Sequence, residues 1–296
     1  MVVDDLSAGR AERLADVPLE QIDLAAEGAA GRLSAVMSGH DVTTVIHLAA
    51  RKKVEESVAR PLWYYQQNVG GLLAVVEASQ AAGVKGIVFS STAAVYGPAD
   101  APVTEDDPTA PVNPYGGTKL VGEWLLRDQA AATGLRAVSL RYFNVAGASS
   151  PELGDTADSN IVPMVYSRLE AGERPRIFGD DYPTADGTCV RDYVHVADVA
   201  DAHLVALDSL ADSGADPYRV FNIGTGTGSS VRELVDRMIA IAGVDVEPLV
   251  EPRRAGDPAI VVADASRIRD ELGWAARHDL DEMLSSAWEA RQAGVS

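Results

Sequence analysis

One pair of residues in the sequence has the spacing of a catalytic base. Tyr115 and Lys119 are four positions apart in a segment with a helical pattern, so a helix would place them one turn apart on the same face. A cation held near a phenol favours the phenolate and lowers the pKa of the tyrosine towards neutrality. Such a tyrosine can take a proton from a hydroxyl group at working pH, so the pair predicts proton abstraction from an alcohol.

An exposed pair that only stabilises a helix is the alternative interpretation of Tyr115 and Lys119. The run Ser90 to Thr92 favours the catalytic interpretation, because it places hydroxyl groups at the end of a predicted strand about one helix before the pair. We predict that Thr92 supplies a second hydroxyl group, which shares with Tyr115 the hydrogen bonding of the reacting alcohol.

The elements around these residues alternate between short β-branched runs and longer helical patterns, which is typical of βαβ units. The predicted strands are Val42–Ala49, Gly86–Ser90, Ala137–Tyr142 and Val220–Ile223. The predicted helices are Pro61–Ala82 and Pro114–Thr133. Polar residues follow the first three strands, and in doubly wound sheets ligands bind outside the carboxyl ends of the strands. We therefore predict an α/β fold with a Rossmann-like doubly wound parallel sheet and a ligand site at that edge.

The pattern loosens after Asn144, where two turn-rich stretches follow at Gly147–Pro151 and Gly179–Gly187. Loops of this length are usually functional. We predict that residues 1–147 form the sheet domain, to which the chain returns at about 191–224. Residues 148–296 are expected to form mainly a smaller second lobe.

Composition excludes several classes of function. The formal net charge of -19 argues against a nucleic-acid or anionic-membrane surface, because both would repel the chain. No apolar run approaches the length of a membrane span, and Met1 is followed by Val2-Val3-Asp4-Asp5 where a signal peptide would carry basic residues. Cys189 is the only cysteine, which excludes an internal disulfide and fits a reducing cytoplasm.

Metal binding is not expected. No His/Asp/Glu cluster has metal-ligand spacing, and His47 and His195 are interpreted as hydrogen-bonded structural residues. The glycine-rich run from Ile223 to Gly228 has neither the residue spacing after its glycines nor the acidic partner that a dinucleotide-binding loop requires. We therefore predict a structural turn there.

The run from Phe178 to Val196, which contains Arg191, is the most specific stretch of the chain. It is similar almost throughout to the signature of UDP-glucose 4-epimerases, a group of the extended short-chain dehydrogenases, and the resemblance extends from about Val3 to Trp288. The resemblance implies an isomerase that uses NAD to interconvert UDP-glucose and UDP-galactose through a 4-keto intermediate. It also implies an NAD-binding first domain, a UDP-sugar-binding second lobe and a homodimer formed by the two long helices.

The same resemblance implies the residues of each site, with Tyr115, Lys119 and Thr92 as the catalytic group. The implied NAD contacts are Asp4, Asp5, Ser7, Asp23, Leu24, Leu48, Ala49, Lys52, Gln67, Thr92, Tyr115, Lys119 and Phe143. The implied UDP-sugar contacts are Lys52, Thr92, Tyr115, Asn144, Asn160, Arg176, Ile177, Phe178, Arg191, Arg254, Asp257 and Val261. Two NAD-site positions depart from the usual pattern: Ala50 stands where glycine is common, and Gln67 where asparagine is common.

The beginning of the sequence departs further from the family. Met1 to Asp5 resembles the tail of the family's second strand, so about 30 residues of strand, glycine-rich turn and helix are expected to precede it. We interpret this as a mis-assigned start or a truncation. Two alternatives to the main prediction remain: an epimerase of UDP-N-acetylhexosamines or UDP-pentoses, and a catalytically silent protein that binds nucleotide sugar.

Overall fold

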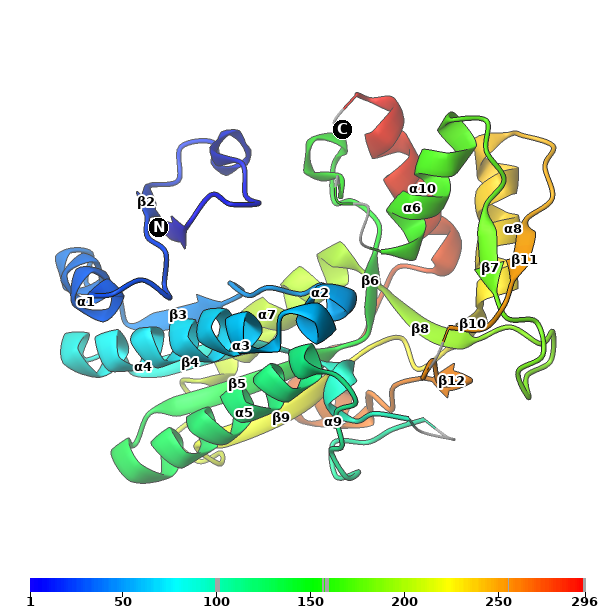
Figure 1. Cartoon of the computed structure of the whole chain (residues 1–296). Coiled ribbons are helices and arrows are strands. Elements are labelled where there is room, and N and C mark those ends of the chain that lie inside the picture. The colour runs from blue at the N-terminus through cyan, green and yellow to red at the C-terminus, as the bar shows by residue number, and fades with distance from the viewer. Residues whose placement is uncertain (99–101, 156, 158–159, 255, 295–296) are drawn as a thin grey trace. The chain divides into compact units, whose positions relative to one another are not determined.

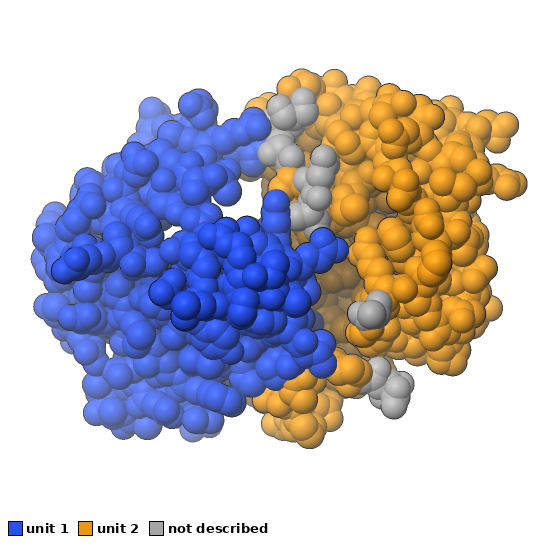
Figure 2. Space-filling view, viewed as in Figure 1, with its two compact units in different colours: residues 1–95, 111–141, 203–220 blue, residues 96–110, 142–202, 221–296 orange. Residues whose placement is uncertain are grey.

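The computed structural model describes every residue except 99–101, 156, 158–159, 255 and 295–296. The chain divides into two compact units, which Figure 2 shows in separate colours. Unit 1 consists of residues 1–95, 111–141 and 203–220, and unit 2 of residues 96–110, 142–202 and 221–296. This division differs from the predicted one, because the chain first leaves unit 1 after residue 95 and unit 2 is about as large as unit 1.

The main sheet of unit 1 has the strand order β3-β4-β5-β9 (Figure 1). These strands are β3 (Thr44–His47), β4 (Gly86–Thr92), β5 (Arg136–Tyr142) and β9 (Tyr218–Ile223). β3 and β4 are parallel, with Thr44 opposite Gly86 and His47 opposite Phe89. Every residue of β4 is buried, as expected for a central strand covered on both faces.

Helices cover both faces of this sheet, which confirms the predicted α/β layering. The side chains of Ser90 and Ser91 point to opposite faces, as neighbouring residues of a strand must. Ser91 bonds to Glu123 of α5 (Pro114–Thr133), whereas Ser90 bonds to His203 of α7 (Val196–Ser209). Each face of β4 is therefore linked to a different helix by a buried hydrogen bond.

The bounds of α5 agree with the predicted helix because its ends carry clear signals. Asn113 is the N-cap and accepts a hydrogen bond from Gly116 N at 2.9 Å, and Pro114 fits the first turn. Gly134 ends the helix with a left-handed φ of 73°. On its inner side Leu126 packs with Phe89 and Leu72 in one hydrophobic cluster.

The segment predicted as one helix over Pro61–Ala82 is helical throughout but is not uniform. It consists of α3 (Pro61–Tyr64), a π-helical segment η2 (Tyr65–Gly70) and α4 (Gly71–Ala82). Such π segments are rare and are frequent at functional sites. This one carries Gln67, an implied NAD contact, and Asn68.

The beginning of unit 1 forms a separate small sheet. β1 (Val2–Asp4) pairs in parallel with β2 (Leu19–Gln21). Val3 of β1 and Val45 of β3 pack against the same buried cluster, which includes Leu33 of α1 (Ala29–Gly39). Among the described residues, however, the two-stranded sheet and the four-stranded sheet share no strand pairing.

Unit 2 is built around β8 (Val190–His195). β6 (Asn144–Ala146) and β12 (Ile260–Val261) pair with β8 in parallel and β10 (Gly228–Ser230) pairs antiparallel, while β7 (Arg176–Phe178) and β11 (Leu249–Glu251) form a parallel pair. The helices are α6 (Ile161–Glu170), α8 (Val231–Ala242), α9 (Ser266–Leu272) and α10 (Leu280–Gln292). Tyr166, Leu234 and Leu284 join α6, α8 and α10 in one core.

The remaining elements are short. They are α2 (Val54–Ala59) and the 3₁₀ turns η1 (Ala11–Leu14), η3 (Ala93–Val95) and η4 (Pro151–Leu153). None of the helices in the described part of the chain is long and apolar enough to cross a membrane.

Candidate active site

Lys119 is buried beside the end of β4. It is 3% exposed, and its Nζ donates a hydrogen bond to Ser90 O at 2.7 Å. The same Nζ lies 4.9 Å from the centroid of the Phe89 ring, which provides a cation–π contact. Burial lowers the pKa of Lys119 to about 7, against the raising effect of the Glu123 carboxylate. The charge of Lys119 therefore depends on a few fixed neighbours.

Tyr115 stands one turn before Lys119 on α5, as predicted, and is 9% exposed. Its helix turn packs closely on the segment that follows β4. A Cβ on Gly116 would lie 2.5 Å from Ala94 O and 3.0 Å from Pro111 Cβ. Only glycine at position 116 permits this approach, which sets where Tyr115 lies relative to the end of β4.

The close approach at Gly116 predicts an unusual effect of alanine. Gly→Ala inside a helix normally stabilises by about 1 kcal/mol. We expect Gly116→Ala to lower the melting temperature by several degrees instead, because the added Cβ meets backbone atoms that must shift. Gly117→Ala is the matched control, since its Cβ would meet only the Tyr65 hydroxyl at 3.0 Å, the tip of an exposed side chain. Equal melting temperatures of the two variants in calorimetry would contradict the contact argument.

Three hydroxyls at the end of β4 have different partners. Ser90 Oγ lies 2.8 Å from His203 Nε2, and Ser91 Oγ donates to Glu123 Oε1 at 2.5 Å. Thr92 Oγ1 accepts a hydrogen bond from Ala94 N at 3.2 Å, which leaves its O–H group to donate. The two serines serve buried contacts, so Thr92 remains the candidate for the shared hydrogen bond.

Arg51 gathers several of the implied NAD contacts and was missed by the sequence reasoning. Its Nη2 lies 2.8 Å from Asp5 Oδ2, its Nη1 donates to Ser7 Oγ at 2.6 Å, and its Nε donates to Gln67 Oε1 at 3.3 Å. The signal was present, since Arg51 belongs to the polar run after the first predicted strand. The family resemblance implied its neighbour Lys52, which is exposed.

Asn68 is a second residue that the sequence reasoning missed. Its Oδ1 accepts from Arg51 N at 2.7 Å, and its Nδ2 donates to Arg51 O at 3.0 Å. The same Nδ2 lies 3.0 Å from Thr118 Oγ1 on α5. The π-helical segment thus fixes the loop after β3 against the helix that carries Tyr115.

The end of β1 presents two carboxylates. Asp4 Oδ1 accepts from Leu6 N at 2.6 Å, and a Cβ on Gly9 would lie only 2.9 Å from that oxygen. Asp5 accepts from both the backbone and the hydroxyl of Ser7. Partial burial raises the pKa of Asp5, but the Ser7 hydrogen bonds and the Arg51 charge outweigh it and hold the pKa below its usual value.

The other implied NAD contacts are more scattered. Asp23 Oδ1 accepts from Ala25 N at 2.9 Å, and Leu24 packs against the cluster that contains Val3. Leu48 and Ala49 are exposed after β3. Phe143 is buried and belongs to unit 2, where its N–H donates to Ile223 O at 3.0 Å.

In unit 2, Arg191 and Asp257 form an ion pair with Nη2 and Oδ1 2.6 Å apart, and the Arg191 side chain is only 13% exposed. Val261 lies opposite Arg191 in the register of β12 and β8. Arg254 stacks on Phe178, with its Cζ 4.0 Å from the ring centroid. These contacts bring five of the implied UDP-sugar residues together in pairs.

The remaining implied UDP-sugar residues of unit 2 lie on neighbouring elements. Asn144 lies opposite Tyr193 in β8 and is exposed. Asn160 is the N-cap residue of α6, and Arg176 Nε is 3.8 Å from Glu251 Oε1. Ile177 is fully buried in the core, so only its main chain can reach a ligand.

The interpretation of the histidines and of the glycine-rich run as structural is consistent with their contacts. His47 stacks on Phe89 at 5.9 Å, and burial lowers its pKa to about 3. His195 stacks on His278 at 4.2 Å. The N–H groups of Thr225 and Gly226 donate to the Asp192 carboxylate rather than to an outside anion. No group of three potential metal ligands occurs among the described residues.

Three comparisons show which known proteins this chain is similar to. The model of the NAD dependent epimerase/dehydratase family matches residues 1–224. A UDP-glucose 4-epimerase of Azospirillum brasilense is 47% identical over 298 residues, covering 98% of this chain and 84% of that protein. One of Corynebacterium glutamicum is 42% identical, covering 97% of this chain and 86% of that protein. A crystal structure of UDP-glucose-4-epimerase from Stenotrophomonas maltophila, with bound NAD and formylated UDP-arabinopyranose, has a TM-score of 0.93 and 41% identity, covering 99% of this chain and 90% of that one.

Proposed function

Because this chain belongs to the NAD dependent epimerase/dehydratase family, we propose that it is a UDP-glucose 4-epimerase, which interconverts UDP-glucose and UDP-galactose. Membership of the family confirms the resemblance seen in the sequence. The observation that carries the proposal is the buried Lys119, held by Ser90 O at 2.7 Å one turn after Tyr115. This arrangement places a phenol and a fixed cation one helical turn apart on α5, with the cation bound at the carboxyl end of a central strand.

The residues present fit NAD. Asp4 ends β1, and a Gly9 Cβ would lie 2.9 Å from its Oδ1, so the backbone beside this carboxylate has no side chain in the way. A carboxylate at the end of this strand of a dinucleotide-binding fold accepts from ribose hydroxyls and disfavours a 2′-phosphate. Asp4, Asp5, Ser7 and Gln67 would hold the adenosine side, and Lys119 and Tyr115 the reactive side.

When bound, NAD supplies the group that accepts hydride from carbon 4 of the sugar and returns it. Tyr115 takes the proton of the 4-hydroxyl and later gives it back. Lys119 stabilises the Tyr115 phenolate by its charge, and Thr92 donates a hydrogen bond to the phenolate oxygen. The protein thus contributes a positioned base and electrostatic support.

In unit 2, Arg191 and Arg254 would bind the pyrophosphate of UDP, because guanidinium groups offer a planar fork to phosphate oxygens. Asp257, which pairs with Arg191 at 2.6 Å, would accept from a hydroxyl group of the ligand. Anchoring by UDP lets the 4-keto sugar turn while it stays bound. Such a turn would present the opposite face of carbon 4 and so allow inversion with no net redox change.

A related UDP-sugar as substrate is the second candidate. The structure from Stenotrophomonas maltophila holds a formylated UDP-pentose, and Val261 is a small residue next to Arg191 in the strand register. UDP-pentoses and UDP-N-acetylhexosamines are therefore included in the test below. A chain that binds nucleotide sugar without turning it over is the alternative outside enzymes.

The experiment incubates the purified protein with UDP-galactose and separates the products, and cofactor is released by denaturation and identified. We expect UDP-glucose as the product and bound NAD. A protein that binds UDP-galactose without product and without NAD would support the silent alternative. Product from a UDP-pentose or a UDP-N-acetylhexosamine but not from UDP-galactose would support a related epimerase.

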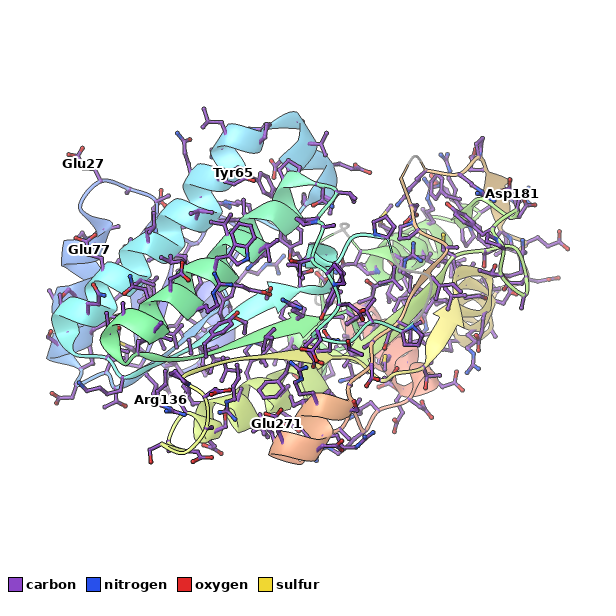
Figure 3. The ribbon with its side chains drawn as sticks, turned by 90° about the horizontal axis from the view of Figure 1, so that it is seen from below. Glu27, Tyr65, Glu77, Arg136, Asp181 and Glu271 are labelled. Carbon is purple, nitrogen blue, oxygen red and sulfur yellow. The ribbon has the colours of Figure 1, made fainter. Side chains whose placement is uncertain are left out.

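We also infer a cytoplasmic homodimer, for which the exposed apolar residues of unit 1 give support. Leu62 of α3, Leu73 of α4 and Trp124 of α5 are 72%, 49% and 48% exposed. Figure 3 shows Tyr65 on the helical segment beside α5, and a Gly117 Cβ would lie 3.0 Å from the Tyr65 hydroxyl. Exposed apolar side chains on α3, α4 and α5 suit a symmetric interface. The single cysteine, which is buried, is compatible with a reducing compartment.

Light scattering during gel filtration tests the dimer. We expect twice the 31.2 kDa of the chain, and a shift towards the monomer mass in Leu62→Glu and Trp124→Glu. Leu204→Glu is the matched control, because Leu204 is 55% exposed on α7, away from the two helices. A monomer mass at all concentrations of the unchanged protein would refute the dimer.

A further inference from the structure

A buried network of charges extends the Tyr115–Lys119 motif by one more turn of α5. Glu123 follows Lys119 by four residues, so the two side chains share one face of the helix. The Glu123 and Arg141 side chains are only 3% and 6% exposed. Arg141 binds both carboxylate oxygens, with Nε to Oε1 at 2.9 Å and Nη2 to Oε2 at 2.6 Å.

The same strand contacts both members of the extended motif. Ser90 O accepts from Lys119 Nζ at 2.7 Å, and the next residue, Ser91, donates its hydroxyl to Glu123 at 2.5 Å. Arg141 reaches Glu123 from β5, the neighbouring strand. Lys119 and Glu123 are therefore fixed to consecutive residues of β4, and a movement of one would carry the other.

Burial of an ion pair is weak evidence that the pair exists for stability, because its desolvation cost offsets its attraction. A buried pair is expensive to break on one side, however, so it holds its position firmly. A fixed carboxylate near a buried lysine directly affects how readily that lysine is protonated. It favours the ammonium form of Lys119. Repulsion between like charges gives the Arg141 guanidinium the opposite effect.

We propose that Glu123 is a positioning residue that, held by Arg141 and Ser91, fixes both the location and the protonation state of Lys119. This inference rests on the proposed function, in which Lys119 supports the Tyr115 base. Glu123 and Arg141 touch no substrate and act only through Lys119. In this pair, the Glu123 carboxylate raises the charged fraction of Lys119 and the Arg141 guanidinium lowers it.

Other titratable groups also face Lys119 and must be counted. Tyr115 shares its helix, and His47 reaches it from β3 by charge interaction. His203 of α7 bonds to the side chain of Ser90, the residue whose carbonyl binds Lys119. Burial and then the Lys119 charge lower the pKa of His47 to about 3, so His47 stays neutral around pH 7. Glu123 and Arg141 are thus the charges to vary.

The test measures the protonation of Lys119 directly. The chain has four lysines, Lys52, Lys53, Lys85 and Lys119, so lysine labelled with ¹³C at Cε gives few NMR signals, and Lys119→Met assigns the one of interest. The titration is recorded for the protein without sugar. We expect Glu123→Gln to lower the midpoint of Lys119 by about one pH unit or more, and Arg141→Gln to raise it by a clearly smaller amount.

Opposite shifts distinguish an electrostatic role from a merely structural one. Loosening of the helix would move the Lys119 midpoint in the same direction in both variants, and that outcome, or no shift in either, would overturn the proposal. Glu233→Gln is the matched control: Glu233 pairs with Arg237 at i,i+4 on α8 of unit 2, so its loss should leave Lys119 unchanged.

A single variant that leaves one buried charge unpaired is at risk of not folding. The double variant Glu123→Gln/Arg141→Gln avoids this, and it should still lower the Lys119 midpoint, because the carboxylate is the charge on the same helix face. An unchanged midpoint in a folded double variant would refute the proposal. The titration needs no turnover, so its failure is distinct from an absence of UDP-galactose conversion, which would refute only the proposed function.

In an active protein the same shift has a kinetic consequence. The ammonium form of Lys119 is lost as pH rises through its pKa, which is about 7 with Glu123 in place. In Glu123→Gln the alkaline decline of turnover should therefore move to lower pH by the shift seen in NMR. A profile that keeps its shape and only falls in height would contradict an effect through Lys119.

Discussion

Replacing Tyr115 by phenylalanine is expected to lower turnover of UDP-galactose by about 10²-fold or more, with little change in affinity for the UDP-sugar. The change removes the proton acceptor and nothing else of size, because the ring keeps its buried position on α5, where Tyr115 is 9% exposed. Product formation over time gives turnover, and calorimetric titration with UDP-sugar gives affinity. Loss of rate without loss of binding is the signature of an interaction made in the transition state.

Tyr218→Phe is the matched control for Tyr115→Phe. It also removes one phenol hydroxyl from unit 1, but that hydroxyl bonds to Ser139 Oγ at 3.1 Å on β5. We expect its turnover to stay within a few-fold of the unchanged protein. Near-normal turnover of Tyr115→Phe, or equal losses in the two variants, would show that Tyr115 is not the base.

The elements that could be predicted from the sequence carry their own local signals. α5 has an N-cap asparagine, a proline in its first turn and a glycine after its last residue, and both of its ends agree with the prediction. The four main strands were recognised from their apolar runs, although β3 is shorter than predicted because only Thr44–His47 pairs. Hydrophobic periodicity and capping residues indicate local structure, and they were sufficient to predict these helices and strands.

The parts that could not be predicted depend on distant partners. Nothing in the run Tyr65–Gly70 indicates a π-helix, which becomes intelligible only when Asn68 is seen to bond Arg51 and Thr118. Arg51 was likewise not predicted as a site residue, and its contacts with Asp5 and Gln67 are seen only in the structure. Contacts of this kind are set by the tertiary fold and leave no periodic trace in the sequence.

The extended motif on α5 illustrates the same limit within one helix. Its spacing of four residues from Tyr115 to Lys119 was visible, and Glu123 continues that spacing. Glu123 forms its buried ion pair with Arg141, which lies on β5, the strand that follows α5 in the chain. The sequence shows which residues share a helix face, and the structure is needed to show which charges are buried against that face.

The second large effect is expected at Val261, the residue that by its spacing from Arg254 and Asp257 resembles a gatekeeper beside the 2-substituent of the sugar. Simple packing in the run Ile260–Val262 is the alternative. Val262 is 6% exposed and Val261 is only half-buried, so Val262 takes the core face and Val261 the other face of the strand. Because Val261 lies opposite Arg191, its face is the one next to the proposed UDP site.

A valine at this position leaves room for an N-acetyl group, whereas a tyrosine would fill that space with close-packed atoms. We therefore expect the protein to interconvert UDP-N-acetylglucosamine and UDP-N-acetylgalactosamine as well as the plain hexoses. Val261→Tyr should abolish the first activity and spare the second, both measured as initial rates of product formation. Val261→Ile, which adds a single methylene group, serves as the control and should retain both. No N-acetylhexosamine turnover in the unchanged protein, or an equal loss of both activities in Val261→Tyr, would show that Val261 does not select the sugar, because a steric gate must act on the larger substrate alone.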